Sequence, residues 1–378
     1  MGPSRWALSL LFCVSSFAIA QQSSAPESHP PNQEASDQRH PALAHRSPLP
    51  PGSREGQIQL DVVVTDAAGR SVTGLQQGDF TLLDDKKPQP IRFFRAVDGQ
   101  PVQGAIEPAV EVILLIDATN NSLRNIAFER NQVEKFLCQN GGHLSQPVTL
   151  MIFSERGVQV GSQPSTDGNL VAQELDKSGA TMHTVQRSGG NDAIERMGLS
   201  LKSLRSIAAV EAPKPGRKML IWIGPGWPML EGPGYRASDA TQRYLFNAIV
   251  ETTRELREAR ITMYNVNQLD PQSPGTMRTN FYKSFLKGVP SPRQAESGDL
   301  SLPVLAIHSG GLVLNAAGDL VDQLNRSVAE AKAYYTLGFD PSQAEHTDEY
   351  HELEVKISKP GMKARTNTGY YAEPTFQP

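Results

Sequence analysis

The middle of the chain alternates short apolar runs with longer stretches of helical periodicity. Consecutive apolar residues are typical of strands that are buried on both faces of a parallel sheet. Such runs occur at 112–116, 148–153, 218–223 and 261–266. Helices are expected around them at 121–137, 169–177, 192–208, 239–260, 302–308 and 319–331. This strand–helix repetition predicts an α/β fold with a doubly wound, mainly parallel sheet over residues 109–333.

The segments on either side of this block show the alternation of half-buried strands. Every second residue from Ile58 to Val64 is apolar, and further short strands are expected up to Phe94. Near the C-terminus, strands are expected at 333–339, 350–357 and 364–371. Neither group is large enough to form a stable sandwich alone. We therefore expect residues 57–100 and 334–374 to pair into one small β-sandwich, with the α/β domain inserted between them.

Three further segments follow neither periodicity. Residues 270–300 are rich in proline, which predicts an inserted surface loop. Residues 21–56 consist mostly of Pro, Ser, Gln and His and cannot bury enough surface to fold, so we expect a disordered linker. A histidine-based metal tract is the alternative there. Residues 1–20 combine Arg5, an apolar core and the small-x-small pattern Ala18-Ile19-Ala20, which predicts a cleaved secretory signal peptide.

Export follows from that signal peptide, and the mature chain is expected to be secreted or periplasmic. A membrane anchor is the alternative for residues 1–20, but the apolar stretch is short for a bilayer span. No later segment is apolar enough to cross a membrane. The formal net charge of -4, with 20% charged residues, gives no reason to expect a nucleic-acid partner.

Cysteine and catalytic chemistry are sparsely represented. Of the two cysteines, Cys13 lies in the signal peptide, so neither a disulfide nor a cysteine-based zinc site is expected. Cys138 lies on the first helix and is interpreted as a small core residue. His-Glu-x-x-His and Gly-x-Ser-x-Gly motifs are both missing from the sequence, which favours a protein that is not an enzyme.

Three motifs resemble one known family. The strand at 112–116 ends on Asp117, and Asp117-Ala-Thr119-Asn-Asn121-Ser122 resembles the Asp-x-Ser-x-Ser metal loop of von Willebrand factor type A (VWA) domains. Residues 62–94, VVVTDAAGRSVTGLQQGDFTLLDDKKPQPIRFF, resemble the leader region of a bacterial, secreted subfamily of VWFA-related proteins. The segments YYTLGFDP and YHELEVKISKPGMKARTNTGYYA near the C-terminus resemble the same subfamily.

This resemblance implies a metal-ion-dependent adhesion site at the carboxyl edge of the sheet. Family members hold a divalent cation there, and Mg²⁺ suits such an oxygen cage. The implied ligands are Asp117, Thr119 and Asn121. The chain departs from the pattern in three places: Asn121 replaces a hydroxyl, Gly189-Gly190-Asn191 replaces Gly-Gly-Thr, and Gly224 stands where an aspartate is common. We therefore expect a degenerate site with weak or no metal dependence. The alternative is that Asp117 and Asn121 form a helix-capping turn.

The resemblance also implies a function. We expect an exported protein-binding or adhesion module that uses the carboxyl edge of the sheet, with Asp117, Asn121 and Trp227 contacting the partner. The partner is expected to be an extracytoplasmic protein or a surface polymer. Trp227 lies in a Gly- and Pro-rich loop and is either an exposed contact residue or a lid on the sheet's edge. The alternative function is an envelope enzyme, or an accessory subunit of an envelope enzyme complex.

Overall fold

The computed structural model describes residues 56–98, 108–161, 163–181, 190–229, 232–267, 278–314 and 319–374. These residues belong to one compact unit. The signal peptide expected at 1–20 and the linker expected at 21–56 lie outside the described residues, apart from Gly56. In the described part, no helix has both the length and the apolarity that a membrane span requires.

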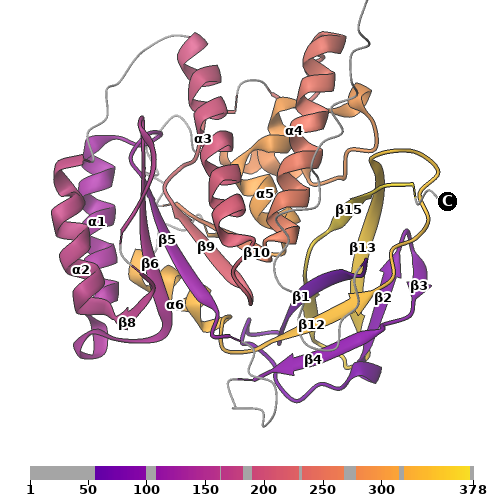
Figure 1. Cartoon of the computed structure of the whole chain (residues 1–378), viewed down its shortest axis with the longest axis horizontal. Helices are drawn as coiled ribbons and strands as arrows, with labels where there is room; N and C mark the ends of the chain where they lie inside the picture. Colours follow the sequence, from indigo (N-terminus) through magenta and orange to yellow (C-terminus); the bar gives the residue numbers. More distant parts are fainter. Residues whose placement is uncertain are drawn as a thin grey trace, which may run out of the picture. The chain divides into compact units, whose positions relative to one another are not determined.

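A seven-stranded sheet forms the centre of the α/β domain (Figure 1). Its strand order is β11-β10-β9-β5-β6-β7, and β8 also pairs with β6. The parallel strands are β5 (Glu111–Asp117), β6 (His143–Ser154), β9 (Lys218–Ile223), β10 (Ile261–Val266) and β11 (Val313–Leu314). The short strands β7 (Gly157–Val160) and β8 (Ser165–Asp167) run antiparallel to β6. The prediction of a doubly wound, mainly parallel sheet is confirmed.

Helices cover both faces of this sheet. Helices α1 (Leu123–Leu137), α2 (Gly168–Lys177) and α6 (Leu320–Ala329) pack on one face. Helices α3 (Gly190–Glu211), α4 (Asp239–Glu258) and α5 (Leu302–His308) pack on the other. The apolar run of β5 serves both layers, because side chains of a strand alternate between its faces. Val112, Leu114 and Ile116 belong to the first core, and Ile113 and Leu115 belong to the second.

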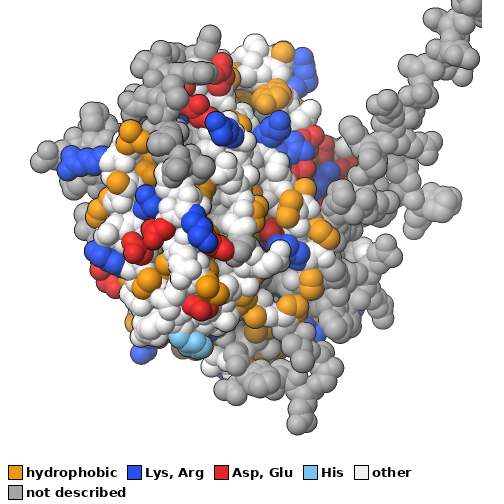
Figure 2. All heavy atoms as spheres, turned by 60° about the vertical axis from the view of Figure 1, so that its left-hand side comes forward, with side chains coloured by type: hydrophobic (Ala, Val, Ile, Leu, Met, Phe, Trp, Pro, Cys, Tyr) orange, Lys and Arg blue, Asp and Glu red, His pale blue; other side chains and the backbone are white. Residues whose placement is uncertain are grey.

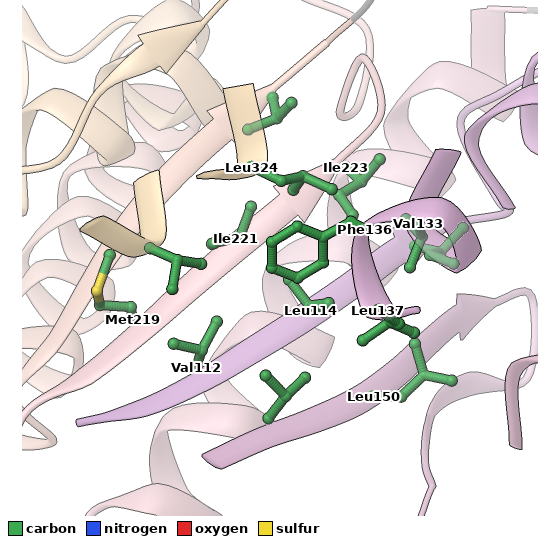
Figure 3. Packing of buried hydrophobic residues seen from close by; sticks show 14 of the residues in the cluster. Val112, Leu114, Val133, Phe136, Leu137, Leu150, Met219, Ile221, Ile223 and Leu324 are labelled. Atoms are coloured by element: carbon green, nitrogen blue, oxygen red, sulfur yellow. The ribbon is translucent and has the colours of Figure 1, made fainter. Parts of the chain in front are cut away.

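Figure 3 shows the first core, in which side chains of β5, β6 and β9 meet those of α1 and α6. Phe136 of α1 and Leu324 of α6 lie over Leu114 and Ile221 of the sheet. These side chains are 5% exposed or less. Each one stabilises the fold by about 1.5–3 kcal/mol relative to an exposed side chain.

The two ends of the chain form the predicted sandwich of two four-stranded sheets. One sheet has the order β14-β1-β12-β4, with β1 (Ile58–Thr65), β4 (Phe93–Val97), β12 (Tyr334–Phe339) and β14 (Lys363–Arg365). The other has the order β15-β13-β2-β3, with β2 (Phe80–Asp84), β3 (Lys87–Gln89), β13 (Glu349–Ile357) and β15 (Gly369–Ala372). The single strand expected at 364–371 is wrong, since this stretch contributes β14 to one sheet and β15 to the other.

A buried ion pair joins the sandwich to the α/β domain. Arg260, between α4 and β10, donates to both carboxylate oxygens of Asp61 on β1, at 2.7 and 3.1 Å. The two side chains are 6% and 8% exposed. Burial raises the pKa of Asp61, but the charge and hydrogen bonds of Arg260 outweigh it and hold this pKa below its usual value. The pair therefore holds β1 against the α/β domain, because breaking it would leave one buried charge without its partner.

Residues 278–300 differ from the expected surface loop. They form three 3₁₀ segments: Arg278–Phe285, Pro292–Gln294 and Ser297–Leu300. Phe285, Val289 and Leu300 are buried, and Val289 and Leu300 belong to the core beneath α4 and α5. Pro292 is the first residue of its segment, where its missing N–H group costs no hydrogen bond. The segment is therefore not a surface loop throughout, because its last part, Ser297–Leu300, is buried.

Candidate functional site

Asp117 is the last residue of β5, and its carboxylate is enclosed by N–H donors. Its Oδ1 accepts hydrogen bonds from the backbone N–H groups of Thr119 (3.1 Å) and Asn120 (2.9 Å). Its Oδ2 accepts from the Asn120 side-chain amide and from the Trp222 indole, both at 2.9 Å. Asp117 is fully buried. These bonds agree with the alternative that Asp117 caps the turn between β5 and α1.

Asn121 connects this turn to a buried glutamate. Its side-chain Nδ2 donates to both carboxyl oxygens of Glu129 at 2.9 Å, and its Oδ1 accepts from the Ser122 N–H. Ser122 is the N-cap of α1, since its hydroxyl accepts from the Asn125 N–H at 3.2 Å. Glu129 is only 2% exposed. Sequence reasoning missed Glu129, which lies on the apolar face of α1 that Ile126 and Val133 define.

Burial changes the acidity of both carboxyl groups. It raises the pKa of Asp117, and the hydrogen bonds from Asn120 and Trp222 only partly oppose this. It raises the pKa of Glu129 from its usual value of 4.5 to about 8, against the opposing hydrogen bond from Asn121. The nearby charge of Asp117 raises the pKa of Glu129 further. Glu129 is therefore mostly protonated at neutral pH, and the pair does not supply two negative charges at once.

The residues around Asp117 do not fit a Mg²⁺ site. Two buried oxygens, Thr119 Oγ1 and Asn120 Oδ1, have no hydrogen-bond partner among the described residues. Both are neutral, however, while the Asp117 carboxylate faces N–H groups that would repel a cation. Mg²⁺ requires several oxygen ligands with carboxylate charge among them. Asp117, Thr119 and Asn121 therefore do not form the cage that the resemblance implied.

Gly224 explains why a second carboxylate cannot be added at this edge. It has a φ of +133°, and a Cβ built on it would lie 2.9 Å from Cβ of Asp117. A side chain at this position would need both a strained backbone and displacement of Asp117. Of the expected second loop, Ser188 and Gly189 lie outside the described residues, and Asp192 pairs with Arg196 at 2.9 Å. Instead, α3 supplies Ser200, which accepts from the Asn120 amide at 3.2 Å.

Trp227 is a lid and not an exposed contact residue. It is 5% exposed, its indole N–H donates to the Leu300 carbonyl at 3.1 Å, and its ring packs edge-on against Trp222 at 5.7 Å. Asp117 is fully buried and Asn121 is 7% exposed. The prediction that these three side chains contact a partner directly therefore disagrees with their burial. Cys138 also differs from its expected place in the core, since it is exposed at the C-cap of α1.

Several large apolar side chains are exposed where helices begin. They are Leu123 at the start of α1 (57% exposed), Ile194 near the start of α3 (56%), Tyr235 in the segment before α4 (53%) and Tyr244 in α4 (60%). Helices that follow parallel strands begin at the carboxyl edge of the sheet, which places these residues along the predicted functional edge. Ile194 continues the apolar face of α3, whose next members, Met197 and Leu201, are buried.

The surface beside these residues has mixed charge. An open groove of about 570 Å³ runs between α3 and α4, and its lining includes Tyr244, Arg205, Glu251 and Glu255. On the face shown in Figure 2, basic and acidic side chains are interspersed with small hydrophobic areas. Neither sign of charge covers a continuous area of that face.

Among the known proteins compared, only solved structures match this chain. No family model and no curated protein matches this chain. An aerotolerance-related membrane protein from Bacteroides fragilis NCTC 9343 is 10% identical over 59% of this chain and 98% of its own, with a TM-score of 0.33. The VWA domain of SpRpn10 is 12% identical over 62% of this chain and 100% of its own, with a TM-score of 0.28.

The human COPII-coat protein Sec24c is 9% identical over 71% of this chain, with a TM-score of 0.32, and the match spans 44% of its own length. A VWA domain is thus among the solved structures to which this chain shows a remote likeness. The fold class itself rests on the strand order and the helical layers described above, because these likenesses are remote.

Proposed function

We propose that this chain is an exported, non-enzymatic protein-binding module of the adhesion type. Its contact surface is the carboxyl edge of the sheet, and its partner is an extracytoplasmic protein or a surface polymer. The observation that carries the proposal is the exposure of Leu123, Ile194, Tyr235 and Tyr244 at this edge, each by more than half. Exposed apolar and aromatic side chains on one edge can provide the anchors of a protein interface.

Binding through this edge does not depend on a cation in our proposal. The Asp117 carboxylate stabilises the loop from within, since it orients the β5–α1 turn and holds Trp222. Trp227 closes the edge from above by its bond to Leu300. The buried centre thus keeps the loops in place, while their exposed neighbours contact the partner.

The absence of catalysis is supported by the state of the two candidate carboxyl groups. Asp117 and Glu129 are buried, and every carboxyl oxygen of the pair accepts at least one hydrogen bond from the protein. A general acid or base must instead reach the substrate directly or through one water molecule. Export is supported by the sequence pattern of residues 1–20.

The contact surface is tested by two matched substitutions on α3. Ile194 and Val210 lie near opposite ends of this helix and are 56% and 55% exposed. The purified chain, immobilised and exposed to envelope extract, should capture a partner. Ile194→Asp should lower the affinity for this partner at least tenfold, a loss of about 1.4 kcal/mol in binding free energy. Val210→Asp and a chelator should leave capture unchanged. Equal effects of the two substitutions would refute the edge as the contact surface.

Export and the absence of catalysis have separate tests. Mass spectrometry of the mature protein should find an N-terminus at Gln21, and an intact Met1 in a cytoplasmic fraction would contradict export. The purified chain should not turn over an envelope polymer. Turnover that disappears when one residue of this chain is substituted would favour the enzyme alternative.

A further inference from the structure

A cluster of possible metal ligands lies in the sandwich, outside the α/β domain. Asp84 ends β2, Asp85 follows it in the turn to β3, and His351 lies on the neighbouring strand β13. One ligand atom from each of the three residues lies within 4.8 Å of the other two. His351 Nδ1 is 2.9 Å from Asp84 Oδ1 and 3.2 Å from Asp85 Oδ2. Antiparallel pairing of β2 with β13 thus creates a cluster of two carboxylates and one imidazole.

The remaining carboxylate oxygens are held by the protein. Asp84 Oδ2 accepts from the hydroxyl groups of Ser342 (2.6 Å) and Tyr370 (2.8 Å), and Asp85 Oδ1 accepts from the Glu352 N–H (2.9 Å). One oxygen of each aspartate is therefore left facing the imidazole. Hydrogen bonds that orient ligands in this way are characteristic of metal sites.

The imidazole is also fixed, and one of its nitrogens lacks a partner. His351 is 5% exposed, and its ring stacks on Tyr370 with a centroid distance of 5.0 Å and an interplanar angle of 20°. Its Nε2 is buried without a hydrogen-bond partner among the described residues, and the nearest carboxylate, Glu349 Oε1, is 4.0 Å away. A cation bound to Nδ1 places the proton on Nε2, where it faces the Glu349 carboxylate.

We propose that Asp84 Oδ1, Asp85 Oδ2 and His351 Nδ1 bind one divalent transition-metal ion such as Zn²⁺. For metal–ligand bonds of about 2.1 Å, the two distances from Nδ1 correspond to angles of roughly 85–100° at the metal. Such angles are close to those of five- or six-coordinate ions and narrower than the roughly 109° of a tetrahedral Zn²⁺ site, so the ion would complete its shell with water. Carboxylate and imidazole ligands suit Zn²⁺ and its first-row neighbours. The side chain of Asp85 is 47% exposed, so water can reach the open coordination positions on that side.

The ion would have a structural role, because it would fasten the β2–β3 turn to β13. This site differs in place and in ligands from the Asp117 loop. It lies where the N-terminal strand β2 pairs with the C-terminal strand β13. Backbone hydrogen bonds and side-chain contacts hold these two strands together. The ion would therefore stabilise the sandwich by binding the folded chain alone.

The experiment is a calorimetric titration of the untagged chain with Zn²⁺, combined with thermal melting. We expect one equivalent to bind and to raise the melting temperature. Asp85→Asn, at an exposed turn position, and His351→Gln should each lower the affinity at least tenfold and reduce the thermal shift. His346→Gln is the matched control, since this nearby histidine is 65% exposed and outside the cluster, and it should change neither quantity.

Two outcomes would overturn the proposal. One is the absence of Zn²⁺ binding at 100-fold molar excess over the wild-type chain. The other is equal affinity of the wild type and Asp85→Asn, which would place any bound ion elsewhere. If His351→Gln does not fold, Asp85→Asn alone decides between these results, because its side chain is largely outside the core.

Discussion

Glu129→Gln provides the sharpest test of the buried carboxyl pair beneath the sheet's edge. Glu129 is 2% exposed and accepts two hydrogen bonds of 2.9 Å from the Asn121 amide. Burial, with the nearby charge of Asp117, raises its pKa to about 8. The unfolded chain releases this proton near pH 4.5, whereas the folded chain keeps it until about pH 8. The folded state therefore binds more protons than the unfolded state between these two values.

The magnitude follows from that difference. The contribution of Glu129 to the free energy of unfolding is largest below about pH 4.5 and decreases as the pH rises towards 8. The decrease is at most about 1.4 kcal/mol per pH unit, or about 5 kcal/mol over the whole interval. Glutamine has nearly the same shape and no titrating proton. Glu129→Gln should therefore remove this dependence while the wild type retains it.

Urea unfolding of both chains at pH 5, 6, 7 and 8 measures the effect. As the pH rises, the free energy of unfolding of the variant should increase relative to that of the wild type, because only the wild type loses the contribution of Glu129. The other titrating groups are the same in both chains, so their effects cancel in the difference. Glu134→Gln is the control, since it removes an exposed carboxyl group from the same helix. A difference that stays constant from pH 5 to pH 8 would show that Glu129 is ionised in the folded protein.

Two further predictions concern the same edge. Millimolar Mg²⁺ should leave the melting temperature unchanged, because N–H donors occupy the Asp117 carboxylate; a shift that disappears in Asp117→Ala would contradict this. Gly224→Ala should lower the free energy of unfolding by about 1–3 kcal/mol, because it combines a φ of +133° with a Cβ contact of 2.9 Å. Gly232→Ala, where no described atom lies within 4 Å of the added Cβ, should have a much smaller effect in the same urea assay.

Local sequence patterns were sufficient for most of the fold. The strand bounds 218–223 and 261–266 and the helix bounds 302–308 were predicted as observed, because the pattern of apolar residues lies within each element. The pairing of the two ends was also predictable, since each lacked partners for its strands. Residues 278–300 were not, because buried 3₁₀ segments have no periodicity that distinguishes them from a loop.

The sites depend on contacts that no local pattern contains. Trp222 donates to Asp117 across 105 residues of sequence, and His351 meets Asp84 across 267. The burial of Trp227 depends on Leu300, which belongs to the segment without periodicity. Asp117 itself could be found, because it ends a buried strand and begins a polar loop. Its surroundings of N–H donors could not, since they come from β9 as well as from its own turn.

The position of β12 between β1 and β4 has a consequence for the order in which the protein can fold. Asp61 on β1 hydrogen-bonds to Thr336 on β12, which is synthesised 275 residues later. At ribosomal rates of about 5–20 residues per second, β1 waits on the order of tens of seconds for this neighbour. During that time the inserted α/β domain can complete its own sheet, whereas the first strands keep open edges. Completion of the sandwich therefore has to wait until the C-terminal strands have been synthesised, and a chain that stops before Tyr334 carries an unfinished β-sheet with open edges.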